Sequence, residues 1–402
     1  MLIGIIREGK KPSDKRVPLT PSQCAEIQKQ FPSIQILVQT SPIRAFEDSE
    51  YLDYGIEVVD SVAHCEILLG VKEVPLDELI PLKTYFFFSH TYKKQLYNRA
   101  LLKTILEKKI RLIDYELLLA ESNGRRLIGF GRYAGIVGAY NGIRAYGLLT
   151  KSFEIRPAHT LFDRNEMQDE LKKVRLPKDI KIAITGKGRV ASGIVEILAS
   201  LNVQSVEAND FLMHSFEKPS YTQLSVKEYV QRIDGRPFLS SEFYMNPVGF
   251  ESAFKPFTQA ADLYISGHYW EKGSPNFIEV EDIKDEKFRI QLIADVSCDI
   301  KGPIVSTLRP STIDDPLYGY NKSTGLEVDF GSENSIGIMA VDNLPCELPR
   351  DASEDFGNEF AEKVLPHLLN NDIEGVLWRA TETKDGVLLP DYQYLQEYVD
   401  SL

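Results

Sequence analysis

The 402-residue chain has few cysteines and fewer basic than acidic residues. Its four cysteines lie far apart without a CxxC pair, which excludes a disulfide scaffold or a structural zinc site and indicates reduced thiols in the cytoplasm. Lys and Arg number 46 against 59 Asp and Glu, giving a net charge of -13 that repels nucleic acid and anionic lipid. We therefore expect neither as a partner, and an anionic substrate would need a locally basic pocket.

Long hydrophobic runs and metal-binding spacings are also missing. The most apolar stretch, Ala134–Leu149, contains Asn141 and Arg144 and falls short of a membrane span. The apolar N-terminal stretch precedes its charges and is too short for a signal peptide. No HxxxH or His/Cys spacing indicates a metal site.

Short apolar runs alternate with amphipathic ones along the first 120 residues, which predicts βαβ units and a parallel sheet. One predicted helix is Pro21–Phe31, where Thr20 can cap and Gln23 can close a capping box. A second is Lys94–Lys109. The predicted strands are Leu2–Ile6, Ile34–Val38, Glu66–Val71, Tyr85–Phe88 and Ile110–Ile113.

A second βαβ pattern opens at Lys181–Gly186, so we expect an α/β protein with two Rossmann-like domains, parallel sheets and a cleft between them. Residues 211–257 have weak periodicity and are predicted to be an irregular connection. Before the second pattern, Gly135, Gly138 and Gly142 line one helix face. They fit tight helix packing, and also a helix that links two domains and begins near the site. The further predicted elements are strands Val203–Asn209, Ala261–Ile265, Ile290–Ala294 and Ser335–Val341 and helix Ala352–Leu369.

The sharpest local motif is GKGRVASG, which follows the strand 181–185 and precedes an amphipathic run. Gly186 permits a tight turn, Gly188 lets the backbone approach a pyrophosphate, and Ala191 replaces the third glycine of the dinucleotide fingerprint. An acidic residue about 20 positions further along the chain should hydrogen-bond to the ribose of the cofactor, and Glu207 and Asp210 are both at a suitable distance in the sequence. An acidic residue there favours NAD, because it repels the 2′-phosphate of NADP. The same residue could instead cap the next turn, so the choice between NAD and NADP stays open.

Candidate acid–base and anion-binding groups lie in the first domain. Lys72 and His90 follow two predicted strands, and carboxyl ends of parallel strands are where α/β sheets place ligands. Together they could share proton transfer, because burial and mutual repulsion lower both pKa values. His90 alone also fits a structural role. Guanidinium groups bind carboxylates, and the candidates are Arg16, Arg125 and Arg126, although adjacent arginines are often solvated loop residues. The remaining histidines are assigned to the core or to solvent: His64, His159, His214, His268 and His367.

Several motifs together resemble a known family. REGKKPSDKRVPLTP resembles the opening of the alanine dehydrogenase–transhydrogenase superfamily. TYFFFSHTYK, GRRLIGFGRYAG, ADVSCDIKGPI and VDNLPCELPRDAS resemble the lysine-forming saccharopine dehydrogenases. ISGHYWEKGSP favours the lysine–2-oxoglutarate reductase branch, whose second dehydrogenase domain we do not expect here.

The resemblance implies a substrate domain of residues 1–133 plus 325–402 and a dinucleotide-binding domain of 134–324. It implies Lys72 and His90 as the acid–base pair. The substrate would contact Arg16, Gln95, Arg126, Phe130, Asp295, Val296 and Ser297. The cofactor would contact Arg125, Gly186, Gly188, Arg189, Asp210, Tyr269, Val341, Asp342, Asn343 and Leu344.

The implied activity is NAD(P)H-dependent condensation of L-lysine with 2-oxoglutarate to saccharopine, or the reverse, by a cytoplasmic enzyme that is compatible with a homo-oligomer. The alternative within the superfamily is an alanine dehydrogenase-like or other opine-type enzyme. The Arg125–Arg126 pair argues against it, because a small monocarboxylate needs fewer cationic anchors. A non-catalytic Rossmann protein is a third hypothesis, which the presence of Lys72, His90 and Arg126 disfavours.

Overall fold

The computed structural model describes residues 1–122 and 124–401 and divides into two compact units. The first comprises Met1–Phe130 and Pro349–Leu402, and the second comprises Gly131–Leu348. Residues 325–348, expected in the first domain, therefore lie in the second unit. The reason is that strand β16 (Ser335–Met339) pairs in parallel with β13 (Leu292–Asp295) inside the second sheet.

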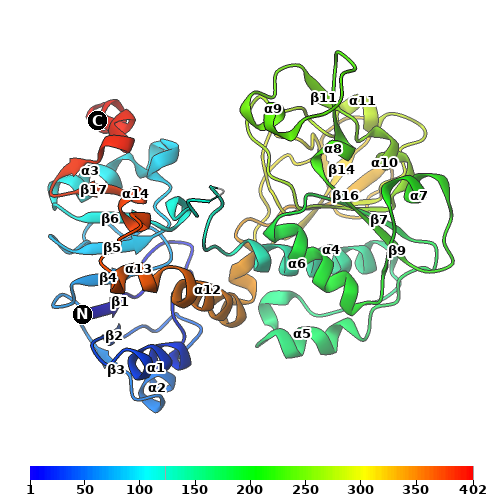
Figure 1. The fold of residues 1–402 in the computed structure, drawn as a ribbon. Coiled ribbons are helices and arrows are strands. Elements are labelled where there is room, and N and C mark those ends of the chain that lie inside the picture. The colour runs from blue at the N-terminus through cyan, green and yellow to red at the C-terminus, as the bar shows by residue number, and fades with distance from the viewer. Residues whose placement is uncertain (123, 402) are drawn as a thin grey trace. The chain divides into compact units, whose positions relative to one another are not determined.

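The first unit is built on an eight-stranded sheet in the order β18-β17-β6-β5-β4-β1-β2-β3 (Figure 1). The six strands from the N-terminal part are parallel, whereas β17 and β18 from the C-terminal segment run antiparallel at one edge. The strands are β1 (Leu2–Ile5), β2 (Gln35–Gln39), β3 (Glu57–Val59), β4 (Ile67–Leu69), β5 (Thr84–Phe87), β6 (Arg111–Asp114), β17 (Thr381–Lys384) and β18 (Val387–Leu388). The helices are α1 (Pro21–Gln30), α2 (Asp48–Asp53), α3 (Arg99–Glu107), α12 (Pro349–Lys363), α13 (Leu365–Leu369), α14 (Val376–Arg379) and α15 (Gln396–Asp400).

The predicted helix starts are only partly correct. Thr20 and Gln23 form the predicted capping box of α1. The predicted helix Lys94–Lys109 begins five residues later, at Arg99, because the preceding residues form two short 3₁₀ turns, Thr91–Lys93 and Leu96–Asn98. The candidate site residues His90 and Gln95 directly precede these two turns.

The second unit is built on another eight-stranded sheet, in the order β15-β14-β16-β13-β12-β7-β9-β8. β14 and β15 are antiparallel and the other strands are parallel, so the expected α/β class with two mostly parallel sheets is confirmed. The further strands are β7 (Lys181–Thr185), β8 (Gln204–Ser205), β9 (Ser220–Leu224), β12 (Leu263–Ser266), β14 (Leu317–Asn321) and β15 (Glu327–Val328), with a separate hairpin of β10 (Val230–Arg232) and β11 (Phe250–Ser252). The helices are α4 (Gly131–Thr150), α5 (Arg164–Leu171), α6 (Arg189–Ser200), α7 (Ala208–Met213), α8 (Val226–Tyr229), α9 (Ser240–Met245), α10 (Lys255–Ala260) and α11 (Val280–Ile283).

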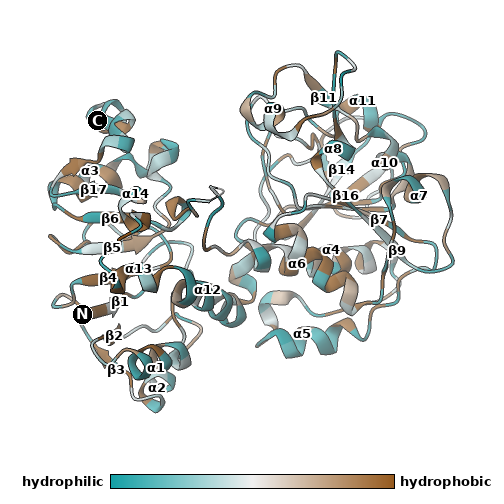
Figure 2. Cartoon of the chain, viewed as in Figure 1, coloured by the Kyte–Doolittle hydropathy of each residue, from teal (hydrophilic) through white to brown (hydrophobic). Residues whose placement is uncertain are grey.

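Glycines on α4 and α6 let these two helices pack at backbone distance. A Cβ at Gly135 would overlap the Val190 carbonyl, and a Cβ at Gly193 would overlap the Arg132 carbonyl. The predicted small-residue face of α4 is therefore a packing face. Hydropathy follows the same layering within each unit. β1 and β4 are largely hydrophobic, whereas α5 and α12, which each bury one face, are largely hydrophilic (Figure 2).

Candidate active site

Lys72 lies just beyond the carboxyl end of β4 and is half-buried. Glu8, which follows β1, accepts hydrogen bonds from the amides of Val71 (2.6 Å) and Lys72 (2.9 Å) and so fixes the backbone there. Burial lowers the pKa of Lys72, and the positive charge of Arg16 lowers it further. A lysine with a lowered pKa can exchange protons at neutral pH.

His90 follows β5 and is bound to a carboxylate that sequence analysis left without a role. Its Nδ1 lies 2.8 Å from Glu73 Oε1, and Lys10 Nζ lies 2.6 Å from Glu73 Oε2. Burial alone would raise the pKa of Glu73, but the hydrogen bonds from His90 and Lys10 lower it to about 2. Glu73 adjoins Lys72 in the sequence, and this adjacency was the signal that could have identified it.

A buried cluster of oxygen atoms lies behind His90. Asp114 Oδ2 accepts hydrogen bonds from the Ser89 amide (2.8 Å) and from the His90 amide (3.3 Å). Ser89 Oγ lies 2.6 Å from both Asp114 and Thr91 Oγ1 and 3.0 Å from Glu382, whose carboxyl also binds Thr91 at 2.8 Å. Two hydroxyl protons cannot serve all of these contacts, and burial raises the pKa of Glu382 to about 8, so its carboxyl group can supply a further proton. His90 itself has left-handed backbone geometry (φ 55°), which this cluster holds in place.

Arg16 lies on the same side as these groups and is almost fully buried. Its guanidinium makes two hydrogen bonds to Asp14, of 3.0 and 2.6 Å, and its centre lies 4.1 Å from the Phe130 ring centroid. Phe130 packs at 5.9 Å against Phe88, which in turn stacks on His90 at 6.5 Å. The structure thus brings Arg16, Phe130 and His90 together, as the resemblance implied.

The other expected substrate residues of the first unit are more exposed. Arg126 NH1 lies 2.9 Å from Glu116, which also binds Lys93 at 2.8 Å. Arg125 is exposed. The Gln95 side chain accepts a hydrogen bond from Tyr97, so it would have to turn to reach a substrate.

The second unit presents the expected glycine turn between β7 and α6. Gly186 has φ 98°, and a Cβ there would overlap the Gly267 carbonyl, so only glycine fits. Gly188 is the N-cap of α6 without a side-chain cap, and open space surrounds its Cα. α6 begins at Arg189 directly after this turn, and the N-terminus of such a helix is where dinucleotide-binding folds place the pyrophosphate.

The sheet order does not place Asp210 beside this turn. The acidic residue that binds the ribose of a dinucleotide is expected at the end of the strand beside the one that precedes the glycine turn. The strand that precedes the turn is β7, and its neighbour on this side is β9, not the strand predicted near residue 203. Asp210 and Glu207 instead follow the two-residue edge strand β8. Ser225 and the exposed Lys227 follow β9, within a segment that had been predicted to be irregular.

The remaining expected residues gather at the carboxyl edge of the second sheet, but their side chains differ in availability. Asp295 is fully buried and accepts hydrogen bonds from Ser266 (2.6 Å), Ser297 (2.7 Å) and Thr307 (2.7 Å). It therefore holds the loop with Val296 and Ser297, and its own oxygens are already engaged. Gly138 lies close to both Val296 and Leu344. The exposed Tyr269 and the segment Val341, Asp342, Asn343 and Leu344 follow β12 and β16.

A buried histidine lies behind the glycine turn. His268 Nδ1 is 2.6 Å from Thr185 Oγ1, and burial lowers the pKa of His268 to about 4. Its ring packs edge-on against Phe277 at 4.7 Å. His268 is therefore a neutral core residue.

Neither a metal cluster nor a membrane-spanning helix is found in the described part of the chain. Residues 1–122 and 124–401 contain no group of three His, Cys, Asp or Glu residues arranged to hold an ion. Their helices are too short or too polar to cross a bilayer.

Comparison with known proteins supports the expected relationship. Residues 4–137 match the family described as alanine dehydrogenase/PNT, N-terminal domain. The chain is 28% identical to an Arabidopsis thaliana alpha-aminoadipic semialdehyde synthase (98% of this chain, 41% of that protein). It is 26% identical to the NAD(+), L-lysine-forming saccharopine dehydrogenase of Yarrowia lipolytica (90% of both chains). The chain is a homologue of saccharopine dehydrogenase.

The saccharopine dehydrogenase homologue also shares its fold with solved structures. An L-alanine dehydrogenase matches with a TM-score of 0.64 at 18% identity over 99% of this chain and 100% of the other. A Sinorhizobium meliloti transhydrogenase matches with a TM-score of 0.58 at 12% identity over 97% and 99% of the two chains. The chain spans about half the length of the semialdehyde synthases, including the mitochondrial rat protein (28% identity, 48% of its length).

Proposed function

We propose that this homologue catalyses the reductive condensation of L-lysine with 2-oxoglutarate to saccharopine, or the reverse oxidation, with NAD(P)H. The observation that carries the proposal is the group of Lys72, Glu73 and His90 beside Arg16 in the first unit. It combines two proton-transferring side chains with a cation that can bind a carboxylate. The names of the relatives support the same substrates.

The side chains of the first unit fit the proton transfers of this reaction. The ε-amine of lysine attacks the keto carbon, and the resulting carbinolamine loses water to give an imine. Lys72 would take the proton that leaves the amine, because a lowered pKa raises the fraction of Lys72 in the neutral form. His90 would give a proton to the departing hydroxyl group.

Arginines would hold the carboxylates of the substrates. Arg16 is rigid because Asp14 and Phe130 fix its guanidinium, so it suits a carboxylate that must be placed accurately. Arg126 is half-exposed and paired with Glu116, which suits a carboxylate that arrives from solvent. These cations make the site locally basic on an acidic protein.

The glycine turn of the second unit would hold the pyrophosphate of the cofactor through the amides at the start of α6. When bound, NAD(P)H supplies the hydride that reduces the imine carbon. The loop Val296–Ser297, held by Asp295, would line the same edge of the sheet.

All four cysteines are free thiols, which supports a reducing compartment such as the cytoplasm.

The test is an assay of NAD(P)H oxidation with purified protein and a panel of amino and keto acids. We expect oxidation only when L-lysine and 2-oxoglutarate are both present, with saccharopine as the product by mass spectrometry. Oxidation with pyruvate and ammonia would instead indicate an alanine dehydrogenase. Cofactor binding in calorimetry without turnover on any pair would indicate a non-catalytic protein.

A further inference from the structure

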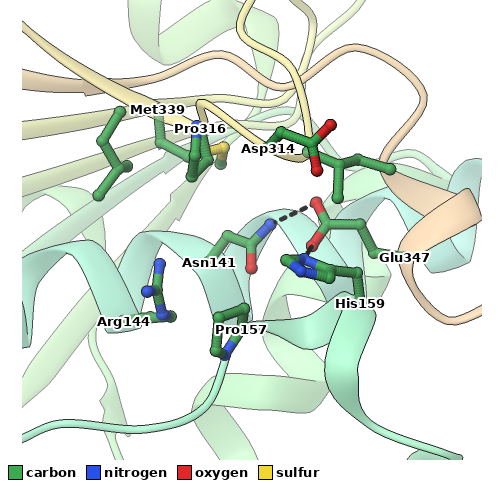
Figure 3. A pocket seen from close by; sticks show the side chains of 10 residues that line it. Asn141, Arg144, Pro157, His159, Asp314, Pro316, Met339 and Glu347 are labelled. Carbon is green, nitrogen blue, oxygen red and sulfur yellow. Dashed lines mark hydrogen bonds and ion pairs between the residues drawn. The ribbon is translucent and has the colours of Figure 1, made fainter.

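A small polar cavity of about 190 Å³ lies in the second unit, outside the residues assigned to cofactor or substrate (Figure 3). Its lining includes Asn141 and Arg144 from α4, His159, and Glu347 at the end of the 3₁₀ turn Leu344–Glu347. Drug-sized ligands need about 300 Å³ or more, so this cavity fits a molecule of only a few heavy atoms.

The acidic end of the cavity has fewer hydrogen-bond donors than a buried carboxylate requires. Glu347 is only 3% exposed, and in the described residues its carboxylate accepts one hydrogen bond, from Asn141 Nδ2 at 2.8 Å. The half-exposed His159 approaches the other oxygen only to 3.8 Å. Burying an ionised carboxylate is costly unless it is closely paired, and the ion pair with His159 is long, so a closer cation would stabilise Glu347.

At the basic end of the cavity, Arg144 has more hydrogen-bond donors than the surrounding residues have acceptors for it. Arg144 uses its Nε to donate a 3.3 Å hydrogen bond to the Ile155 carbonyl. Within the described residues its two terminal nitrogens make no hydrogen bond or ion pair, and Figure 3 shows them directed toward the cavity. A guanidinium offers five donors in a planar arrangement that matches a carboxylate.

We propose that this cavity binds a small zwitterionic α-amino acid. Its ammonium group would bind the buried Glu347 and its carboxylate would bind the half-buried Arg144, so that each charged group gains a close partner of opposite charge. Glu347 and Arg144 line the same cavity from opposite sides of Asn141, and a ligand that carries both charges satisfies both. A ligand with one charge would leave the other group unpaired.

Calorimetric titration of the whole protein tests this proposal with four probes: glycine, L-alanine, acetate and methylammonium. We expect glycine and L-alanine to bind in the millimolar range, and acetate and methylammonium to bind at least tenfold more weakly. Absence of amino-acid binding would overturn the proposal and indicate a water-filled cavity. Equal binding of acetate and L-alanine would also overturn it, because an anion site does not need Glu347.

Two variants locate the binding. Glu347→Gln should bind L-alanine no better than acetate, and Arg144→Gln should bind it no better than methylammonium. Glu333→Gln, on an exposed loop of the same unit, is the matched control and should bind like the wild type. Unchanged L-alanine binding by both cavity variants would place the ligand elsewhere and overturn the proposal. Thermal melts verify folding, and the titration needs no turnover, so its result is independent of the proposed reaction.

Discussion

His90 Nδ1 lies 2.8 Å from Oε1 of Glu73. With a pKa of about 2, Glu73 is ionised at neutral pH and can only accept, so His90 Nδ1 is the donor. The contact fixes the ring orientation and leaves Nε2 as the nitrogen that would exchange a proton in the proposed reaction.

Replacing either acid–base residue should reduce turnover strongly. We expect Lys72→Met or His90→Gln to lower kcat by about 10²–10⁴, the usual contribution of general acid–base catalysis. Steady-state kinetics with lysine and 2-oxoglutarate measure this loss. Thermal stability should stay close to that of the wild type, and a large loss of stability with activity intact would assign these residues a structural role.

Glu73→Gln tests whether the carboxylate orients His90. The amide no longer guarantees an acceptor facing Nδ1, so we expect kcat to fall by about 10- to 100-fold, as for other groups that orient an active histidine. The pH profile of kcat should shift as well, because the charge beside His90 is lost. Glu73→Asp shortens the side chain but keeps the charge, and a pH profile shifted equally in both variants would contradict this role.

The strand order predicts a preference for NADPH over NADH. Ser225 follows β9 beside the glycine turn, and its amide and hydroxyl engage the carboxylate of Glu228, the acid nearest to it in the sequence. The exposed Lys227 lies two residues further and could bind a 2′-phosphate. Lys227→Glu should lower kcat/KM for NADPH at least tenfold and change that for NADH little. Asp210→Asn is the control and should alter neither. A selective increase in kcat/KM for NADPH in Asp210→Asn would contradict this prediction and identify Asp210 as the residue that binds the ribose.

Stability should decrease as pH rises through the range in which Glu382 titrates. Burial and the charge of Asp114 raise the pKa of Glu382 to about 8 from about 4.5. Between these values the folded protein keeps a proton that the unfolded chain has released, so the free energy of unfolding falls with increasing pH. Glu382→Gln removes this group's titration and should flatten the slope measured by urea unfolding from pH 5 to 8. Glu374→Gln, which is exposed in the same unit, should leave the slope unchanged.

Gly135→Ala should destabilise the second unit. The new Cβ would overlap the Val190 carbonyl, which belongs to the backbone and cannot rotate away. We therefore expect the free energy of unfolding to fall by about 1–3 kcal/mol. Gly188→Ala, which meets open space at a negative φ, should cost far less. Equal melting temperatures of the two variants would mean that α4 and α6 pack differently.

The sequence predicted those features that depend on local patterns. Strands ending near Lys72 and His90, the capping box at Thr20 and the glycine turn at Gly186 all follow from short-range spacing. The family resemblance supplied Arg16 and Phe130, which the structure does bring near His90.

Features that depend on long-range pairing could not be predicted in this way. The position of β9 beside β7 is set by strand pairing across 35 or more residues, and β9 lies in a segment with weak periodicity, so Asp210 was assigned from sequence distance alone. The residues on either side of His90 have a partner of the same character: Glu382 binds Thr91 across 291 residues, and no local pattern relates the two.

That separation has a consequence for synthesis of the protein. The second unit is continuous in sequence and can fold once residue 348 has left the ribosome. The first unit lacks β17 and Glu382 until residues 381–384 emerge, so the turn that follows His90 stays unsupported until then. The second unit would thus complete its sheet during synthesis before the first unit does.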